Sequence, residues 1–437
     1  MNDMPNRALP PPDTGPPGPD RLRPVRPGPF GVLDIGTTKI ACIIFRVEND
    51  GEIRVLGYDF RQGLGVRGGN IVDLAKAERA IRGCVGQAEN MADTRLRAVY
   101  VNLTCGQPAS HVYELPWQIG QAGEGRPVTD DDIRDVMRTG RLRSRTGGRD
   151  PAHVMPLNFR TDETPNVADP RGLYCATLHT RLHVIDAAST SVSSLRACLQ
   201  RCDLDIEDMV SAPLASGLST LTFDEREIGA TIVDMGGGTT NVASFQDHQL
   251  IHTAQIPLGG LHVTTDLAKG LSTPLAHAER MKTLWGNVDN SPDDDRDMLA
   301  VPRVGEPDHL LAKVPRSMVV NIIRPRIEET LEQVRDALAE SGLSQATGNR
   351  IVLTGGACLL PGVVNLASRI LGHEVRVGRP GIPRGMPELA SGPAFATAIG
   401  LVAWAAGRGG LFRDLEPDPV RERGWFTRFV DYVRDHV

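Results

Sequence analysis

The sequence predicts an α/β protein built from two related halves, because one hairpin motif rich in glycine and threonine occurs twice along the chain. Residues 232–245, IVDMGGGTTNVASF, read as a strand, a tight turn and a second strand. Residues 33–45, LDIGTTKIACIIF, repeat the order of Asp, an apolar residue, Gly and then Thr-Thr, and also close on Phe. Self-similarity between distant segments is typical of duplicated units. Each half is therefore expected to present one hairpin.

The turn of the second hairpin has the chemistry of a phosphate site. Three successive glycines, residues 236–238, let a ligand approach the backbone closely and point several N–H groups into one concavity. The threonine hydroxyls that follow add hydrogen-bond donors. Asp234 ends the first strand, where its carboxylate is suited to hold a metal-bound water. For one such hairpin alone an ordinary glycine turn is the favoured explanation, but two matching copies favour a pair of phosphate sites.

A third motif follows later in the chain. Residues 351–363, IVLTGGACLLPGV, read as a buried strand, a Gly-Gly turn and a helix that opens near Pro361. The three motifs together resemble the phosphate-one, phosphate-two and adenosine motifs of the actin, Hsp70 and sugar-kinase superfamily, over about residues 30–407. The resemblance implies an actin-like two-domain ATPase fold that closes on ATP and Mg²⁺.

By this resemblance, Asp34 and Asp234 would position water bound to Mg²⁺, while Gly355 and Gly356 would pack beside the adenine and ribose. Lys39 is a candidate partner of the γ-phosphate, or it faces solvent on its strand. The residues implied as a phosphate cradle are Gly36, Thr37, Thr38, Lys39, Gly236, Gly237, Gly238, Thr239 and Thr240.

A helix predicted over residues 274–285 resembles the superfamily helix that approaches the ribose and adenine through Glu279 and Lys282. An exposed charged helix face explains the same two residues equally well. Relatives that hydrolyse ATP briskly carry Glu or Gln where this chain has Ala212, and many have Asp in place of Asn241. These departures predict slow ATP turnover at most, with ATP acting as a conformational clamp.

Another glycine-rich segment, residues 63–69, matches the G-x-G-x-x-G pattern of dinucleotide-binding proteins. The strand before it follows a hairpin, and no acidic residue ends a second strand at the required distance, so a mobile surface loop is the better interpretation. No G-x-x-x-x-G-K-[ST] sequence occurs in the chain, which excludes a P-loop.

Composition narrows the class of protein further. The formal net charge is −6, which argues against a nucleic-acid partner bound through bulk charge. The seven cysteines include no C-x-x-C pair and read as reduced, mostly buried thiols. No apolar run approaches the roughly 18 residues that span a bilayer, and no signal peptide is recognisable.

The order of motifs divides the chain into subdomains. Within the first half we expect a helix from about Val72 to Met91 and a return to the sheet at residues 183–187; Val319–Leu343 reads as a long amphipathic helix. The expected divisions are a disordered Pro-rich tail, 1–29; a first subdomain, 30–106 with 183–212 and 379–406; an insert, 107–182; a second core subdomain, 213–258 with 319–378; a smaller subdomain, 259–318; a flexible linker, 407–423; and a terminal helix, 424–437.

The last fourteen residues are predicted to form an amphipathic helix. Its apolar side chains fall on one face, and they are Trp425, Phe426, Phe429, Tyr432 and Val433. A helix that docks on the protein body would show the same pattern. A long linker before it favours a membrane-surface helix that binds anionic lipid weakly alone and more strongly when the protein polymerises.

The hairpins, the insert and the amphipathic tail together resemble the FtsA family of bacterial cell-division proteins. That resemblance implies self-association and recruitment of later division proteins through the insert, and binding of the C-terminal peptide of FtsZ within about residues 259–318. It also implies a place on the cytoplasmic side of the inner membrane at the septum. A soluble kinase for sugars or acetate and a pilus-assembly scaffold share the nucleotide frame and remain alternatives.

Overall fold

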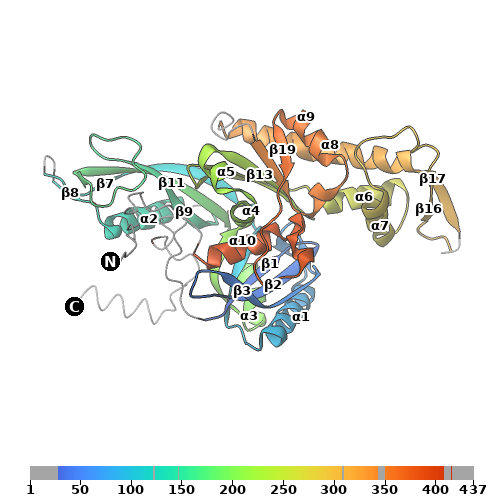
Figure 1. The fold of residues 1–437 in the computed structure, drawn as a ribbon, viewed down its shortest axis with the longest axis horizontal. Coiled ribbons are helices and arrows are strands. Elements are labelled where there is room, and N and C mark those ends of the chain that lie inside the picture. The colour runs from blue at the N-terminus through green and yellow to red at the C-terminus, as the bar shows by residue number, and fades with distance from the viewer. Residues whose placement is uncertain are drawn as a thin grey trace, which may run out of the picture.

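The computed structural model describes residues 28–121, 124–145, 147–307, 310–342, 350–407 and residue 415. The predicted terminal helix and nearly all of the predicted N-terminal tail and linker lie outside the described residues. Figure 1 shows two sheet-based halves at the centre, with the insert at one end of the molecule and the smaller subdomain at the other.

The first half is a five-stranded sheet that begins with the first predicted hairpin. Its strands run in the order β12-β6-β1-β2-β3, with β1 antiparallel to β2 and parallel to β6. The elements are β1 (Phe30–Ile35), β2 (Lys39–Val47), β3 (Ile53–Gln62), β6 (Ala98–Leu103) and β12 (Asp205–Ser211), with helices α1 (Leu74–Ala92) and α3 (Ser189–Arg201). Helix α1 confirms the predicted helix and begins at Leu74, where the Asp73 side chain accepts the Lys76 N–H as an N-cap.

The second half repeats this arrangement strand for strand. Its sheet has the strand order β15-β14-β13-β18-β19. This is the order of the first sheet, with β13, β14, β15, β18 and β19 in the places of β1, β2, β3, β6 and β12. The register also matches, because Asp34 pairs with Ala41 and Asp234 pairs with Asn241. The strands are β13 (Ala230–Met235), β14 (Thr240–Gln246), β15 (Gln249–Ile256), β18 (Arg350–Thr354) and β19 (Glu374–Val377). The predicted duplication is confirmed.

Two helices lie between the sheets and hold the halves together. They are α4 (Ala212–Thr220) and α10 (Ala396–Ala405). Alternate strand residues point to opposite faces, so Val32 and Ile232 meet α4 and α10 while Leu33 and Val233 face outward onto other helices. Both strands of each hairpin are consequently buried on both faces, which explains why their sequences are apolar with little alternation.

The remaining helices cover the outer faces. α8 (Arg316–Glu340) and α9 (Val363–Leu371) pack on the second sheet, and the short helix α5 (Phe223–Ile228) leads into β13. The smaller subdomain consists of α6 (Gly260–Gly270), α7 (Leu275–Trp285), β16 (Met298–Pro302) and β17 (Leu311–Pro315). Three 3₁₀ turns, η1 (Gly356–Leu359), η2 (Glu388–Ser391) and η3 (Pro393–Phe395), complete the connections. In the part of the chain that the structure describes, no helix combines the length and the apolar composition needed to cross a membrane.

The insert is a separate three-stranded antiparallel sheet packed on one helix. Its order is β7-β11-β9, and the elements are β7 (Ala109–Gln118), β9 (Arg149–Arg160), β11 (Thr177–Ala188) and α2 (Asp130–Ser144), with a small ladder of β8 (Arg126–Pro127) and β10 (Tyr174–Cys175). Helix α2 begins with the predicted cap, in which the Thr129 hydroxyl accepts the Asp132 N–H. Leu415 is buried among the apolar side chains of the insert.

Two local predictions are wrong. Residues 183–187 do not return to the first sheet, because β11 continues through Ala188 and pairs along this stretch with β7 and β9. The chain returns instead through α3 and β12. The segment 63–69 is more than a surface loop, since Val66 is buried and β4 (Val66–Arg67) pairs with β5 (Asn70–Ile71).

The contact between the two central helices predicts a sharp difference between two glycine substitutions. An added Cβ at Gly400 would lie 1.7 Å from the carbonyl oxygen of Ala215, so Gly400→Ala should lower the free energy of unfolding by about 3 kcal/mol. Gly86, inside α1, has open space at the same position. Gly86→Ala should therefore raise stability by about 0.5–1 kcal/mol. Urea unfolding followed by circular dichroism compares the two, and equal effects would contradict the close approach.

Candidate functional site

A cavity of about 380 Å³ opens between the two halves, at the strand ends where both hairpins turn. The predicted residues that line it are Asp34, Gly36, Thr37, Thr38, Lys39, Asp234, Gly236, Gly237, Gly238, Thr239, Glu279, Lys282, Gly355 and Gly356. Thr240 does not line it, because its hydroxyl points into the fold and donates to the Leu258 carbonyl at 2.9 Å. Segments more than 300 residues apart in sequence therefore meet in one cavity.

The two hairpin tips face each other in the lining of the cavity. Both turns have the same internal bond, from Gly36 N–H to the Lys39 carbonyl and from Gly236 N–H to the Thr239 carbonyl. A Cβ added at Gly238 would lie 2.3 Å from the Thr37 hydroxyl oxygen, and so collide with the opposite hairpin. Only glycine fits this approach, which leaves backbone N–H groups of both tips accessible to one ligand.

The first carboxylate of the site lies beside a cation. Asp34 Oδ2 is 3.9 Å from Lys39 Nζ, and the ammonium group donates to the Ala394 carbonyl and lies 3.7 Å above the centre of the Phe395 ring. Burial raises the pKa of Asp34 to about 6, although the Lys39 charge opposes this. Burial also lowers the pKa of Lys39. Both groups are more costly to keep charged here than in water, so a ligand that supplies opposite charge is favoured.

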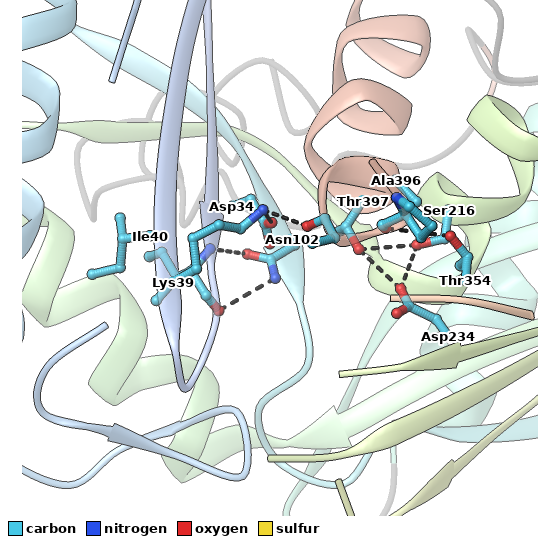
Figure 2. Close-up of polar contacts among 12 residues, drawn as sticks. Asp34, Lys39, Ile40, Asn102, Ser216, Asp234, Thr354, Ala396 and Thr397 are labelled. Carbon is cyan, nitrogen blue, oxygen red and sulfur yellow. Dashed lines mark hydrogen bonds and ion pairs between the residues drawn. The ribbon is translucent and has the colours of Figure 1, made fainter. Parts of the chain in front are cut away.

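Neutral donors surround the second carboxylate. Asp234 Oδ2 accepts hydrogen bonds from Ser216 Oγ at 2.5 Å and from Thr397 Oγ1 at 3.0 Å, as Figure 2 shows. Burial raises the pKa of Asp234, and the two hydroxyls oppose the rise. Gly355, at φ +83°, packs against the same carboxyl, since an added Cβ would lie 2.4 Å from Asp234 Oδ1. The turn at Gly355 thus closes directly on the second hairpin.

Three residues that support the site were not predicted from the sequence. Ser216 and Thr397 hold Asp234, and Asn102 bridges the end of β1 by accepting the Ile35 N–H at 2.7 Å and donating to the Ile35 carbonyl at 3.3 Å. The one sequence signal was a polar residue near the end of an apolar strand, in Val99–Leu103 for Asn102. Serine and threonine within helices give no comparable signal.

Glu279 and Lys282 line the cavity from helix α7. Lys282 Nζ donates to Glu279 Oε2 at 2.7 Å, to Thr264 Oγ1 at 2.9 Å and to the Gly260 carbonyl at 3.1 Å. The Lys282 side chain is 18% exposed. These bonds fix the ammonium group against the start of α6, in a position to meet a polar ligand in the cavity.

The two positions whose residue types predict slow turnover, Ala212 and Asn241, also line the cavity. Ala212 begins α4, and the Asn241 amide is held by Gln255, whose Nε2 donates to Asn241 Oδ1 at 3.1 Å. A methyl group and an amide cannot take a proton from water at neutral pH. The described residues contain no group of three or more His, Cys, Asp or Glu side chains placed to bind a metal directly. Two separate carboxylates suit an ion held through its water shell, as Mg²⁺ commonly is.

Comparisons with known proteins agree with this arrangement. Residues 231–400 match the family model described as cell division protein FtsA, and residues 111–186 match the SHS2 domain inserted in FtsA. The chain is 39% identical over 414 residues to the cell division protein FtsA of Agrobacterium fabrum, covering 90% of this chain and 93% of that protein. It is 31% identical over 383 residues to the Escherichia coli K12 protein of the same name, covering 85% and 88%.

Solved structures show the same fold at low sequence identity. A chain of the PilM–PilN type IV pilus biogenesis complex aligns with a TM-score of 0.62 at 17% identity, over 86% of this chain and 98% of that one. MreB5 of Spiroplasma citri bound to AMPPNP aligns with a TM-score of 0.52 at 12% identity, over 94% of this chain and 100% of that one. The predicted actin-like fold is confirmed.

The buried carboxyl of Asp34 predicts a pH-dependent stability difference. Its raised pKa means that the folded state disfavours ionisation, so the penalty is absent below about pH 4 and complete above about pH 6. Asp34→Asn should therefore stabilise the ligand-free protein by up to about 3 kcal/mol at pH 7.5, and hardly at all at pH 4. Urea midpoints across this range measure the effect. The exposed Asp135→Asn serves as control, and a pH-independent gain in Asp34→Asn would contradict the assignment.

Proposed function

The chain belongs to the FtsA family of cell-division proteins, and on that premise we propose that it binds ATP with Mg²⁺, polymerises on the cytoplasmic face of the inner membrane and tethers FtsZ filaments there. It would also help to recruit later division proteins to the septum. The two facing glycine hairpins above a pair of buried carboxylates carry the ATP part of this proposal.

The lining residues fit a nucleotide with its metal. The N–H groups and hydroxyls of Gly36–Thr38 and Gly236–Thr239 would cradle the phosphates, with Lys39 toward the γ-phosphate. Asp34 and Asp234 would hold the water shell of Mg²⁺, whose charge relieves their burial.

The lining contributed by α7 and by the turn at Gly355 suits the nucleoside. Glu279 and Lys282 would contact the ribose, and Gly355 and Gly356 would leave a flat surface for the base. With Ala212 in place of a water-orienting side chain, turnover would be slow, and bound ATP would act mainly by holding the halves together.

The other parts of the proposal rest on family membership and sequence pattern. Residues 259–318 would bind the C-terminal peptide of FtsZ, and the insert would mediate self-association and contact later division proteins. Residues 424–437 would bind anionic lipid through the apolar face that includes Trp425, Phe426 and Phe429. The kinase and pilus-scaffold alternatives are not favoured, because the relatives that match along most of the chain are cell-division proteins.

If the two hairpin tips cradle the phosphates, forcing the tips apart should weaken nucleotide binding. Gly238→Ala should weaken binding of a fluorescent ATP analogue at least about tenfold, because the methyl group would force Thr37 away and spoil the phosphate cradle. Gly381→Ala is the matched control, since an added Cβ there meets no atom within 4 Å. Titration by fluorescence anisotropy gives both affinities. Unchanged affinity in Gly238→Ala, or no binding by the parent protein, would reject the site.

The membrane part predicts a loss of lipid binding on removal of the last residues. We expect the full chain to float with liposomes that contain anionic lipid and to carry FtsZ with it, with ATP increasing the floated fraction through polymerisation. A chain that ends at Arg423 should remain at the bottom of the gradient while still binding FtsZ in solution. If both chains float equally, or neither does, the terminal segment is not the membrane tether.

A further inference from the structure

The start of helix α10 is held at the cavity by a triangle of three oxygen atoms. Thr397 Oγ1 and Ser216 Oγ both donate to Asp234 Oδ2, at 3.0 Å and 2.5 Å, and the two hydroxyl oxygens lie 2.9 Å apart (Figure 2). Ser219 Oγ also donates to the Ala396 carbonyl at 2.7 Å. The first turn of α10 is therefore attached to the same carboxylate that would meet a hydrated Mg²⁺.

The number of hydroxyl hydrogens available makes the attachment of α10 to Asp234 sensitive to a ligand. Each hydroxyl has one hydrogen, so when both hydrogens point at an ionised Asp234, the contact between Ser216 and Thr397 contains none. The position of Thr397 then depends on the negative charge of one carboxylate oxygen. A cation that shares this charge weakens the hold on Thr397 without touching α10 itself.

The other end of α10 contacts the insert. The Trp404 ring is buried, its Nε1 donates to Asp208 Oδ2 at 2.7 Å, and it makes a T-shaped contact with the His153 ring with ring centres 5.4 Å apart. His153 belongs to β9 of the insert and accepts the N–H of Ser211 at 3.0 Å. Ser211 directly precedes Ala212, which lines the cavity.

The body of α10 is suited to pass a displacement from one end to the other. Every residue from Ala398 to Ala405 is buried, and Gly400 rests against the backbone of Ala215 with no side chain between the helices. Close-packed helices move as rigid bodies, because their interiors cannot absorb a shift by local repacking. A change at Thr397 is therefore expected to reach Trp404.

We propose that Thr397 is a positioning residue that couples occupation of the cleft by Mg²⁺ and nucleotide to the insert, with α10 as the rigid connection and Trp404 as its contact with the insert. The proposal rests on the proposed binding of nucleotide. It adds a defined route by which that binding reaches the insert.

Trp404 itself supplies the readout. The other tryptophans of the chain, Trp117, Trp285 and Trp425, are changed to Phe, and emission of the remaining Trp404 is recorded during titration with ATP and Mg²⁺ without lipid. A fluorescent ATP analogue measures affinity separately. We expect saturating ATP with Mg²⁺ to shift Trp404 emission, because the indole N–H bond to Asp208 changes.

The threonine variants then test the route. Thr397→Val keeps the shape and removes the hydroxyl, so the Trp404 response should fall at least fivefold, while nucleotide affinity falls about tenfold at most, as for the loss of one hydrogen bond to a charged group. Thr397→Ser should keep the response. Thr330→Val, in α8 and outside the cavity lining, is the matched control for removing a buried threonine hydroxyl and should change neither quantity.

Each outcome separates the two proposals. If the parent protein binds no nucleotide, the proposed function fails. If it binds nucleotide but Trp404 does not respond, or if Thr397→Val responds fully, the coupling is overturned and the nucleotide site stands. Should Thr397→Val fold poorly, the response of the parent protein and the rescue by Thr397→Ser still decide the matter, since a serine that restores stability without the response also overturns the coupling.

Discussion

The centre of this molecule depends on the burial of two carboxylates at the tips of duplicated strands. A carboxylate removed from water is costly unless charge or hydrogen bonds replace the lost solvation. The fold meets this cost differently on its two sides, with the Lys39 ammonium group near Asp34 and two hydroxyls on Asp234. Neither set of neighbours fully compensates its carboxylate for the lost solvation, because the pKa of each carboxylate is still raised. The ligand-free protein is thus less stable than it could be, and binding of a cation would offset this cost, as is common at binding sites.

This asymmetry lies on a symmetric frame. The two sheets share strand order and hairpin register, yet the residue opposite the carboxylate is Ala41 in one half and Asn241 in the other. Duplication therefore fixed where the backbone turns, while side chains on each copy diverged. The result is a cavity with a cation beside one carboxylate and neutral donors around the other, which can distinguish the two ends of a ligand.

The sequence was sufficient for features that depend on local chemistry. Hairpins, glycine turns and the cap at Thr129 follow from conformational preferences of a few neighbouring residues, and all are present. The supporting residues Ser216 and Thr397 were not foreseeable, because their role arises only when segments 18 and 163 residues from Asp234 are brought together.

The prediction of where the insert ends was wrong for a related reason. Residues 183–187 are apolar enough for a strand in either sheet, and only pairing partners decide which sheet they join. The G-x-G-x-x-G segment contains β4, which pairs with β5, and its last glycine, Gly69, lines the cavity. Its packing against the first hairpin, with Gly63 against the backbone of Gly36 and Thr37, could not be read from local sequence.

The contact between Gly400 and Ala215 has a mechanical consequence for the whole molecule. Where two helix backbones touch, there is no side chain to yield, so the two helices cannot approach further at that point, and we expect the halves to rotate about it. The contact would then be an axis of rotation, and the displacement of any part of the molecule would grow with its distance from that axis. The insert and the smaller subdomain lie at opposite ends of the molecule (Figure 1), so a small rotation at the centre produces its largest travel at those two ends.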